Sequence, residues 1–150
     1  MRIARVCRSK YRDLNGKGAA RDGGRWNSPG THIVYASSCG ALAVLEYRVH
    51  AKEYPDDLQI CTIEIPDGLN VERYTEKYTW VPHDATTRHY GDTWVKTKRS
   101  PILSVPSIVV PNQVNYLLNP EHPDLIGLLK CIHEESFLLD VRLFSALAYP

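Results

Sequence analysis

The chain has 150 residues, of which 43% are hydrophobic and 23% are charged, and its formal net charge is +1. This composition predicts one folded domain over residues 1–150 and excludes a disordered chain. The near-neutral charge argues against direct nucleic-acid binding, and no apolar run is long enough to cross a membrane.

The first third of the chain predicts two strands joined by a loop. Residues 3–7 form a short apolar run that is typical of a strand. The charged, glycine-containing segment 9–24 is typical of a loop. Residues 33–36 predict a buried strand.

A helix is predicted over about residues 39–50, with Ser37 and Ser38 as candidate caps for its free amide groups. Glu46 falls at the edge of the helix's apolar arc rather than opposite it, so we expect its carboxylate to be half-buried. The arc consists of Ala41, Leu42, Val44, Leu45 and Val49.

The second half predicts three strands and a helix. Residues 58–67 alternate like a strand, and residues 86–98 have helical spacing with basic residues at the end. Residues 102–110 predict a strand, which Pro106 marks as an edge strand or a bulge. Residues 114–124, VNYLLNPEHPD, predict a short strand followed by a proline-rich turn.

Two segments, residues 70–80 and the tail to residue 150, have no clear pattern. Strands and helices otherwise alternate without a regular βαβ rhythm, so the predicted fold class is α+β.

The cysteines predict neither a zinc site nor disulfides. Cys7, Cys39, Cys61 and Cys131 lack metal-ligand spacing, and a chain of this size needs no disulfide. We expect Cys61, in an apolar strand, to be a small core residue.

The N-terminus lacks the apolar core of a signal peptide, and the expected location is therefore the cytoplasm.

Three polar residues are candidates for chemistry. Arg25 follows two glycines that let backbone approach a ligand, and its planar guanidinium suits phosphate oxygens, although a surface or ion-pair role is commoner. Glu46 could be catalytic or a hydrogen-bonded helix residue. Ser107 follows Pro106, where a bulge would redirect its hydroxyl, but no G-x-S-x-G surrounds it.

Two further residues have ordinary structural explanations. Tyr35 lies in a predicted strand, where tyrosine is more often core than site, and Asn119 precedes a proline, where asparagine normally forms a turn.

Three blocks in order, GGRWNSPGTHIVYAS, ALAVLE and VPSIVVPNQVNYLLNPEHPD, resemble the signature motifs of RES-domain proteins, a family named for its arginine, glutamate and serine. The resemblance covers roughly residues 2–139 and implies one RES domain. It places the family's arginine on Arg25, its glutamate on Glu46 and its serine on Ser107. The family's tyrosine falls on Tyr35, and its last asparagine is matched to Asn119.

The resemblance implies an ADP-ribosyltransferase-like mixed sheet with surrounding helices. It also implies a toxin that is neutralised by an Xre-like antitoxin, with which it could form a higher-order complex. NAD is then the substrate, degraded by hydrolysis or phosphorolysis or used to transfer ADP-ribose to a protein, and no metal is involved. In this scheme Glu46 stabilises charge on the ribose, while Arg25 clamps phosphate or keeps Glu46 ionised. Ser107 positions Glu46 or a ribose, and Tyr35 stacks on nicotinamide.

The sequence does not name the acceptor, so glycohydrolase, phosphorylase and protein ADP-ribosyltransferase all remain open. A catalytically idle partner-binding module is an alternative of another class, which an unchanged NAD level on expression would favour.

Overall fold

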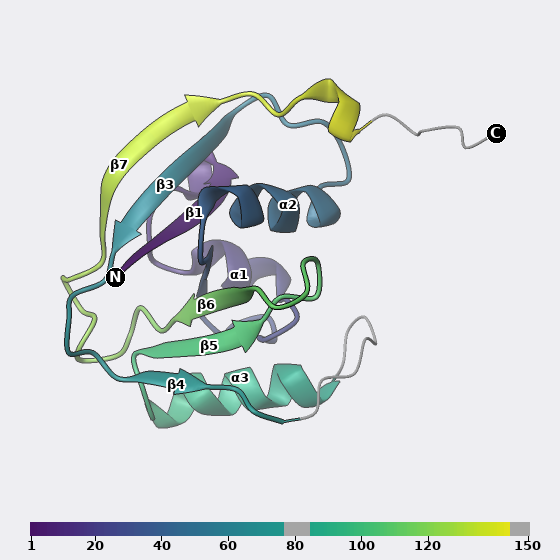
Figure 1. Ribbon diagram of the computed structural model, residues 1–150. Coiled ribbons are helices and arrows are strands. Elements are labelled where there is room, and N and C mark those ends of the chain that lie inside the picture. Colours follow the sequence, from purple (N-terminus) through teal and green to yellow (C-terminus); the bar gives the residue numbers. More distant parts are fainter. Residues whose placement is uncertain (77–84, 145–150) are drawn as a thin grey trace.

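Strands dominate the chain, and the computed structural model describes residues 1–76 and 85–144 (Figure 1). The strands in these residues are β1 (Arg2–Arg8), β2 (Val34–Ser37), β3 (Leu58–Glu64), β4 (Val71–Arg73), β5 (Ile102–Pro106), β6 (Val114–Leu118) and β7 (Lys130–Phe137). The helices are α1 (Lys17–Asp22), α2 (Gly40–His50) and α3 (Ala85–Thr97), with 3₁₀ turns η1 (Ser9–Tyr11) and η2 (Val141–Leu143).

The strands form one mixed sheet in the order β4-β5-β6-β2-β1-β3-β7, with only β4 and β5 parallel. Strand β1 pairs with β3 along its whole length, whereas a single pair, Ala4 with Ser37, joins it to β2. The sheet therefore opens between β1 and β2, as the two groups of strands in Figure 1 show. This mixed sheet with surrounding helices confirms the predicted α+β class.

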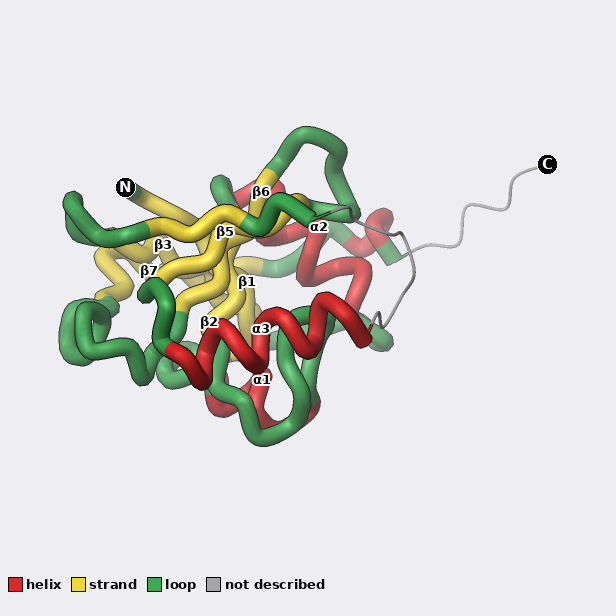
Figure 2. The backbone as a smooth tube through the Cα atoms, turned by 90° about the horizontal axis from the view of Figure 1, so that it is seen from below, coloured by secondary structure: helices red, strands yellow, loops and turns green. Residues whose placement is uncertain are grey.

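Apolar side chains on the two faces of the sheet form two clusters. One contains Ile3, Ile63 and Leu118, and the other joins the sheet to Trp26 and to Trp94 of α3. Figure 2 shows α1 and α3 on the same side of the sheet. No helix within the described residues is long and apolar enough to cross a membrane.

The loop predicted over residues 9–24 is wrong in part, because the segment contains η1 and α1. Gly16 and Gly23 border α1 with φ angles of 70° and 72°, which glycine adopts without strain. The glycines that suggested a loop instead begin and end a six-residue helix.

Helix α2 agrees with its predicted range and Glu46 is half-buried as expected, but the expectation about its caps is wrong. Neither Ser37 nor Ser38 caps it, since their hydroxyls contact the side chains of Asn115 and Gln113. The apolar arc is also only partly covered. Leu42 and its neighbour Ala43 are buried, whereas Ala41, Leu45 and Val49 are exposed. The sheet therefore covers one side of the helix, and the other side faces solvent.

The expectation of free cysteines is wrong for one pair. Cys61 on β3 and Cys131 on β7 are joined by a disulfide, with their Cα atoms 5.8 Å apart. Pairing of two strands that lie far apart in sequence brings them together, which spacing alone does not reveal. Cys61 is a buried core residue as predicted.

Pro106 neither lies in an edge strand nor makes a bulge. It is the last residue of β5, which lies between β4 and β6, so the predicted strand 102–110 is shorter than expected. The unassigned tail contains β7 and η2, and part of the unassigned segment 70–80 is β4. Residues 77–80 and 145–150 of those segments lie outside the described residues.

Candidate functional site

A cavity of about 610 Å³ opens where β1 leaves β2. Four successive β1 residues, from Arg5 to Arg8, line it, together with residues of α1, α2, β5 and β6. Of the five predicted site residues, Arg25, Tyr35 and Glu46 line this cavity directly.

Glu46 lies on α2 and points its half-buried carboxylate toward the neighbouring strands. Its Oε1 accepts a hydrogen bond from the hydroxyl of Ser107 and another from Nδ2 of Asn115, both at 2.6 Å. Neither of these two bonds uses the second oxygen, Oε2. A carboxylate fixed in this way can present its negative charge to a ligand without reorganising.

Ser107 is the buried residue that follows β5. Its Oγ accepts hydrogen bonds from the backbone N–H groups of Val109 and Val110 while donating to Glu46. Its own N–H donates to the carbonyl of Gln113. The turn between β5 and β6 thus fixes the hydroxyl that donates to Glu46.

Arg25 is half-buried and follows the C-terminal end of α1. Its carbonyl accepts a hydrogen bond from the hydroxyl of Thr87 on α3. A Cβ on Gly24 would lie 2.7 Å from the Tyr35 hydroxyl, so this approach of backbone to side chain requires glycine. The segment before Arg25 is therefore tightly packed on the sheet.

Tyr35 uses its hydroxyl within the protein. The hydroxyl donates to Oδ1 of Asn27 at 2.7 Å and accepts from the backbone N–H of Trp26. Burial raises the pKa of the phenol well above its usual value, and so the hydroxyl stays protonated at neutral pH. Tyr35 therefore ties the Arg25 segment to β2 while lining the cavity.

Asn119 does not line the cavity. Its fully buried side chain donates to the carbonyl of Val95 and accepts from the N–H of Glu121. This arrangement is the turn-forming role that its position before proline indicates.

Among the polar residues of the cavity that sequence reasoning missed are Arg5 on β1 and Asn115 on β6. Asn115 pairs with Ser37 across β2 and β6, and only this register brings it to Glu46. Arg5 donates from Nη1 to the carbonyl of Tyr35 at 2.8 Å. Within the described residues, no group of His, Cys, Asp or Glu side chains could hold a metal ion.

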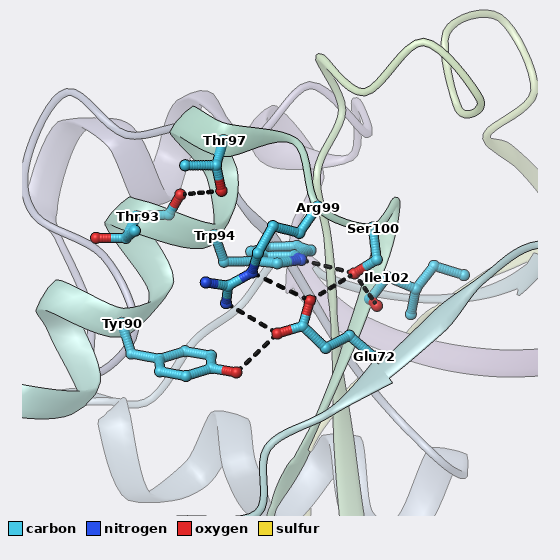
Figure 3. A network of polar contacts seen from close by, with 8 residues as sticks. All are labelled: Glu72, Tyr90, Thr93, Trp94, Thr97, Arg99, Ser100 and Ile102. Carbon is cyan, nitrogen blue, oxygen red and sulfur yellow. Dashed lines mark hydrogen bonds and ion pairs between the residues drawn. The ribbon is translucent and has the colours of Figure 1, made fainter.

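A polar network behind the site holds α3 against β4 (Figure 3). Glu72 accepts hydrogen bonds from the hydroxyl of Tyr90 at 2.7 Å and from Arg99 at 2.8 Å. Burial and the Glu72 carboxylate raise the pKa of Tyr90 to about 12. The fixed helix in turn binds the Arg25 segment, since Asp92 accepts hydrogen bonds from Ser28.

The protein is thus an α+β domain whose sheet opens around a cavity that Glu46 and three arginines line: Arg5, Arg8 and Arg25. The RES domain model matches residues 2–140, and the chain belongs to the RES-domain family, which confirms the resemblance of its three motifs.

Curated relatives agree with this assignment. The chain is 39% identical over 140 residues to the Prs ADP-ribosylating toxin of Sphingobium sp. (strain YBL2), with 87% of this chain and 86% of the relative covered. It is 33% identical over 141 residues to Toxin Res of Pseudomonas putida, with 91% and 96% covered.

A solved structure has the same fold. The crystal structure of the M. tuberculosis MbcT-MbcA toxin-antitoxin complex matches with a TM-score of 0.69, covering 91% of this chain and 84% of that chain. At 17% identity this match shows a shared fold alone.

Proposed function

We propose that this chain is a cytoplasmic toxin that consumes NAD by cleaving the bond between nicotinamide and ribose. The observation that carries the proposal is Glu46, held at Oε1 by Ser107 and Asn115 beside a cavity that Arg25 also lines. The names of the curated relatives support a toxin, and the ADP-ribosylating activity in the name of the Sphingobium relative supports NAD as the substrate.

Cleavage requires a negative group near the ribose. As the C–N bond breaks, its electron pair leaves with nicotinamide, and positive charge builds on the sugar. The Glu46 carboxylate stabilises that charge, and Oε2 accepts a hydrogen bond from a ribose hydroxyl. Arg25 binds phosphate oxygens of the dinucleotide, while the ring of Tyr35 forms a wall for nicotinamide. Asn119 contributes to the site indirectly, because it holds the turn that follows β6.

The acceptor that completes the reaction takes the place of nicotinamide on the ribose and loses a proton. Water gives ADP-ribose, and phosphate gives its 1″-phosphate. A protein side chain is the second candidate acceptor, which the name of the Sphingobium relative favours.

An antitoxin is the proposed partner. The toxin-antitoxin complex of similar fold supports a protein that neutralises this chain, and the family resemblance indicates an Xre-like one. DNA binding is then expected in the antitoxin rather than here.

The decisive test incubates the purified protein with NAD, with and without phosphate, and identifies the products. We expect nicotinamide with ADP-ribose or its 1″-phosphate, and loss of NAD only after a protein is added would indicate transfer. The matched variant is Glu46→Gln, whose amide oxygen can still accept from Ser107 and Asn115. It should fold normally and consume NAD at least about a hundredfold more slowly. Equal rates for both proteins would refute the assignment of Glu46.

A further inference from the structure

Helix α3 contacts the Arg25 segment, residues 25–28, at both of its ends. At the first residue, the hydroxyl of Thr87 donates to the Arg25 carbonyl at 2.9 Å. At the last residue, the carboxylate of Asp92 accepts two hydrogen bonds from Ser28, one from its backbone N–H at 2.8 Å and one from its hydroxyl at 2.6 Å. The helix therefore holds the segment on either side of its two central residues.

The contact with Asp92 uses both oxygens of one carboxylate. Oδ1 accepts the backbone bond and Oδ2 accepts the hydroxyl bond, so Ser28 cannot shift against α3 without losing at least one of them. Hydrogen bonds to a charged acceptor are about twice as strong as bonds between neutral groups. We therefore expect Asp92 to fix the segment more firmly than the neutral bond from Thr87 does.

The residues between Arg25 and Ser28 transmit the position of one to the other. Trp26 is buried, and its ring contacts that of Tyr74 with the centroids 4.7 Å apart. Asn27 is fully buried, and its side chain donates to backbone carbonyls on both sides of the segment. Because residues packed this tightly move together, a displacement of Ser28 also displaces Arg25.

Asp92 can affect a ligand in two ways, through position or through charge. Arg25 lines the cavity and Asp92 does not, so the positional effect acts through the segment. The charge also reaches the cavity wall, since burial mainly raises the pKa of the Tyr35 phenol and the Asp92 carboxylate adds to the rise. A negative charge repels phosphate, so loss of the charge alone would strengthen phosphate binding, whereas loss of the positional effect would weaken it.

We propose that Asp92 is a positioning residue for substrate binding, which holds the Arg25 guanidinium where it meets the phosphate oxygens of the dinucleotide. The inference rests on the proposed use of NAD and on the phosphate-binding role of Arg25. Asp92 acts through Ser28 and the backbone of the segment, without contact with the ligand.

The test is a double-mutant cycle in which calorimetry measures ADP-ribose binding to wild type, Asp92→Ala, Arg25→Ala and the double variant. We expect Asp92→Ala to weaken binding by at least about fivefold. In the Arg25→Ala background the same change should alter affinity by less than about twofold, because the side chain that Asp92 positions is already absent. Equal losses in both backgrounds would overturn the proposal, and so would tighter binding by Asp92→Ala.

Two further variants separate geometry from charge and from the stability of α3. In Asp92→Asn, Oδ1 can still accept from the N–H of Ser28 and the amide can donate to its hydroxyl, so affinity should stay within about twofold of wild type. A loss as large as that of Asp92→Ala would contradict the positional effect. Thr97→Ala is the matched control, because it removes a hydrogen bond to Thr93 that stays within α3 (Figure 3), and it should leave affinity unchanged.

Nicotinamide riboside distinguishes positioning from a general disturbance of the cleft, because it carries no phosphate. It should compete equally well for wild type and Asp92→Ala, and an equal loss for both ligands would overturn the proposal. If Asp92→Ala does not fold, Ser28→Ala replaces it in the same cycle. This variant removes only the hydroxyl bond, and its smaller loss should likewise disappear in the Arg25→Ala background.

The failure of this inference differs from that of the proposed function. If wild type consumes NAD and Asp92→Ala binds ADP-ribose as tightly as wild type, Asp92 has no positioning role and the proposed function stands. If the cycle shows the expected coupling while wild type leaves NAD intact, the proposed function fails and the positioning role of Asp92 remains.

Discussion

Arg25 lines the cavity, and the backbone of its segment is fixed by hydrogen bonds. The backbone is held by Thr87 through the Arg25 carbonyl and by Tyr35 through the N–H of Trp26. Replacing the side chain should therefore leave the backbone in place.

We predict that Arg25→Ala weakens ADP-ribose binding by about 1.5–3 kcal/mol, or roughly 10- to 150-fold, because a charge-assisted hydrogen bond to phosphate is lost. Calorimetry on the folded variant measures this effect directly. Unchanged affinity would exclude a phosphate-binding role, and nicotinamide riboside is the control ligand that should not respond.

The three signature residues illustrate what the sequence could predict. The motifs place Arg25, Glu46 and Ser107 on separate segments, and the helical pattern predicts the local structure of Glu46 correctly. The strand predicted to contain Ser107 instead ends at Pro106. The hydrogen bond from Ser107 to Glu46 depends on the turn after β5, which local patterns do not define. For Asn119, in contrast, the local pattern was enough, because an asparagine before proline predicts a turn and the structure places Asn119 in a buried turn.

Helix α3 packs closely against the Arg25 segment at one glycine, Gly91. A Cβ added at Gly91 would lie 1.8 Å from the carbonyl oxygen of Trp26, which is backbone and cannot rotate away. A helix with a side chain at this position could not approach the segment as closely.

We therefore predict that Gly91→Ala destabilises the protein by about 1–3 kcal/mol, although Ala normally stabilises a helix relative to Gly. The matched control is Gly18→Ala in α1, where the added Cβ would meet only the Tyr11 ring at 3.7 Å. Urea unfolding should show a loss for Gly91→Ala and no loss for Gly18→Ala. Equal stabilities would contradict the close packing of α3 on the Arg25 segment.

The opening of the sheet is a property of the whole molecule that the sequence could not predict. The residues of β1 predict one strand. Nothing in their pattern indicates that β1 and β2 share only one backbone pair. Strand β7 was missed for a related reason. Its exposed, polar residues lack the apolar alternation that identified β3. The disulfide between β3 and β7 then depends on a pairing of strands that is distant in sequence.

The open edge of β1 gives the last prediction, which concerns amide exchange. In an antiparallel pair, alternate residues direct their N–H groups to one neighbour, so half of the amides in residues 5–8 face the cleft rather than β3. In the free protein these amides should exchange faster than those bonded to β3. Saturating ADP-ribose should slow their exchange, because the ligand excludes water from the cleft between β1 and β2.

Residue-resolved hydrogen exchange by NMR can measure both rates in one sample. The control is the set of β3 amides, which pair with β1 or β7 and should not respond to the ligand. Slower exchange over β1 and β3 together would instead indicate global stabilisation by binding. Slowing confined to the cleft-facing amides of β1 would place the ligand where the sheet opens, beside Arg5 and Glu46. Unchanged rates under saturation would mean that ADP-ribose binds elsewhere on the molecule.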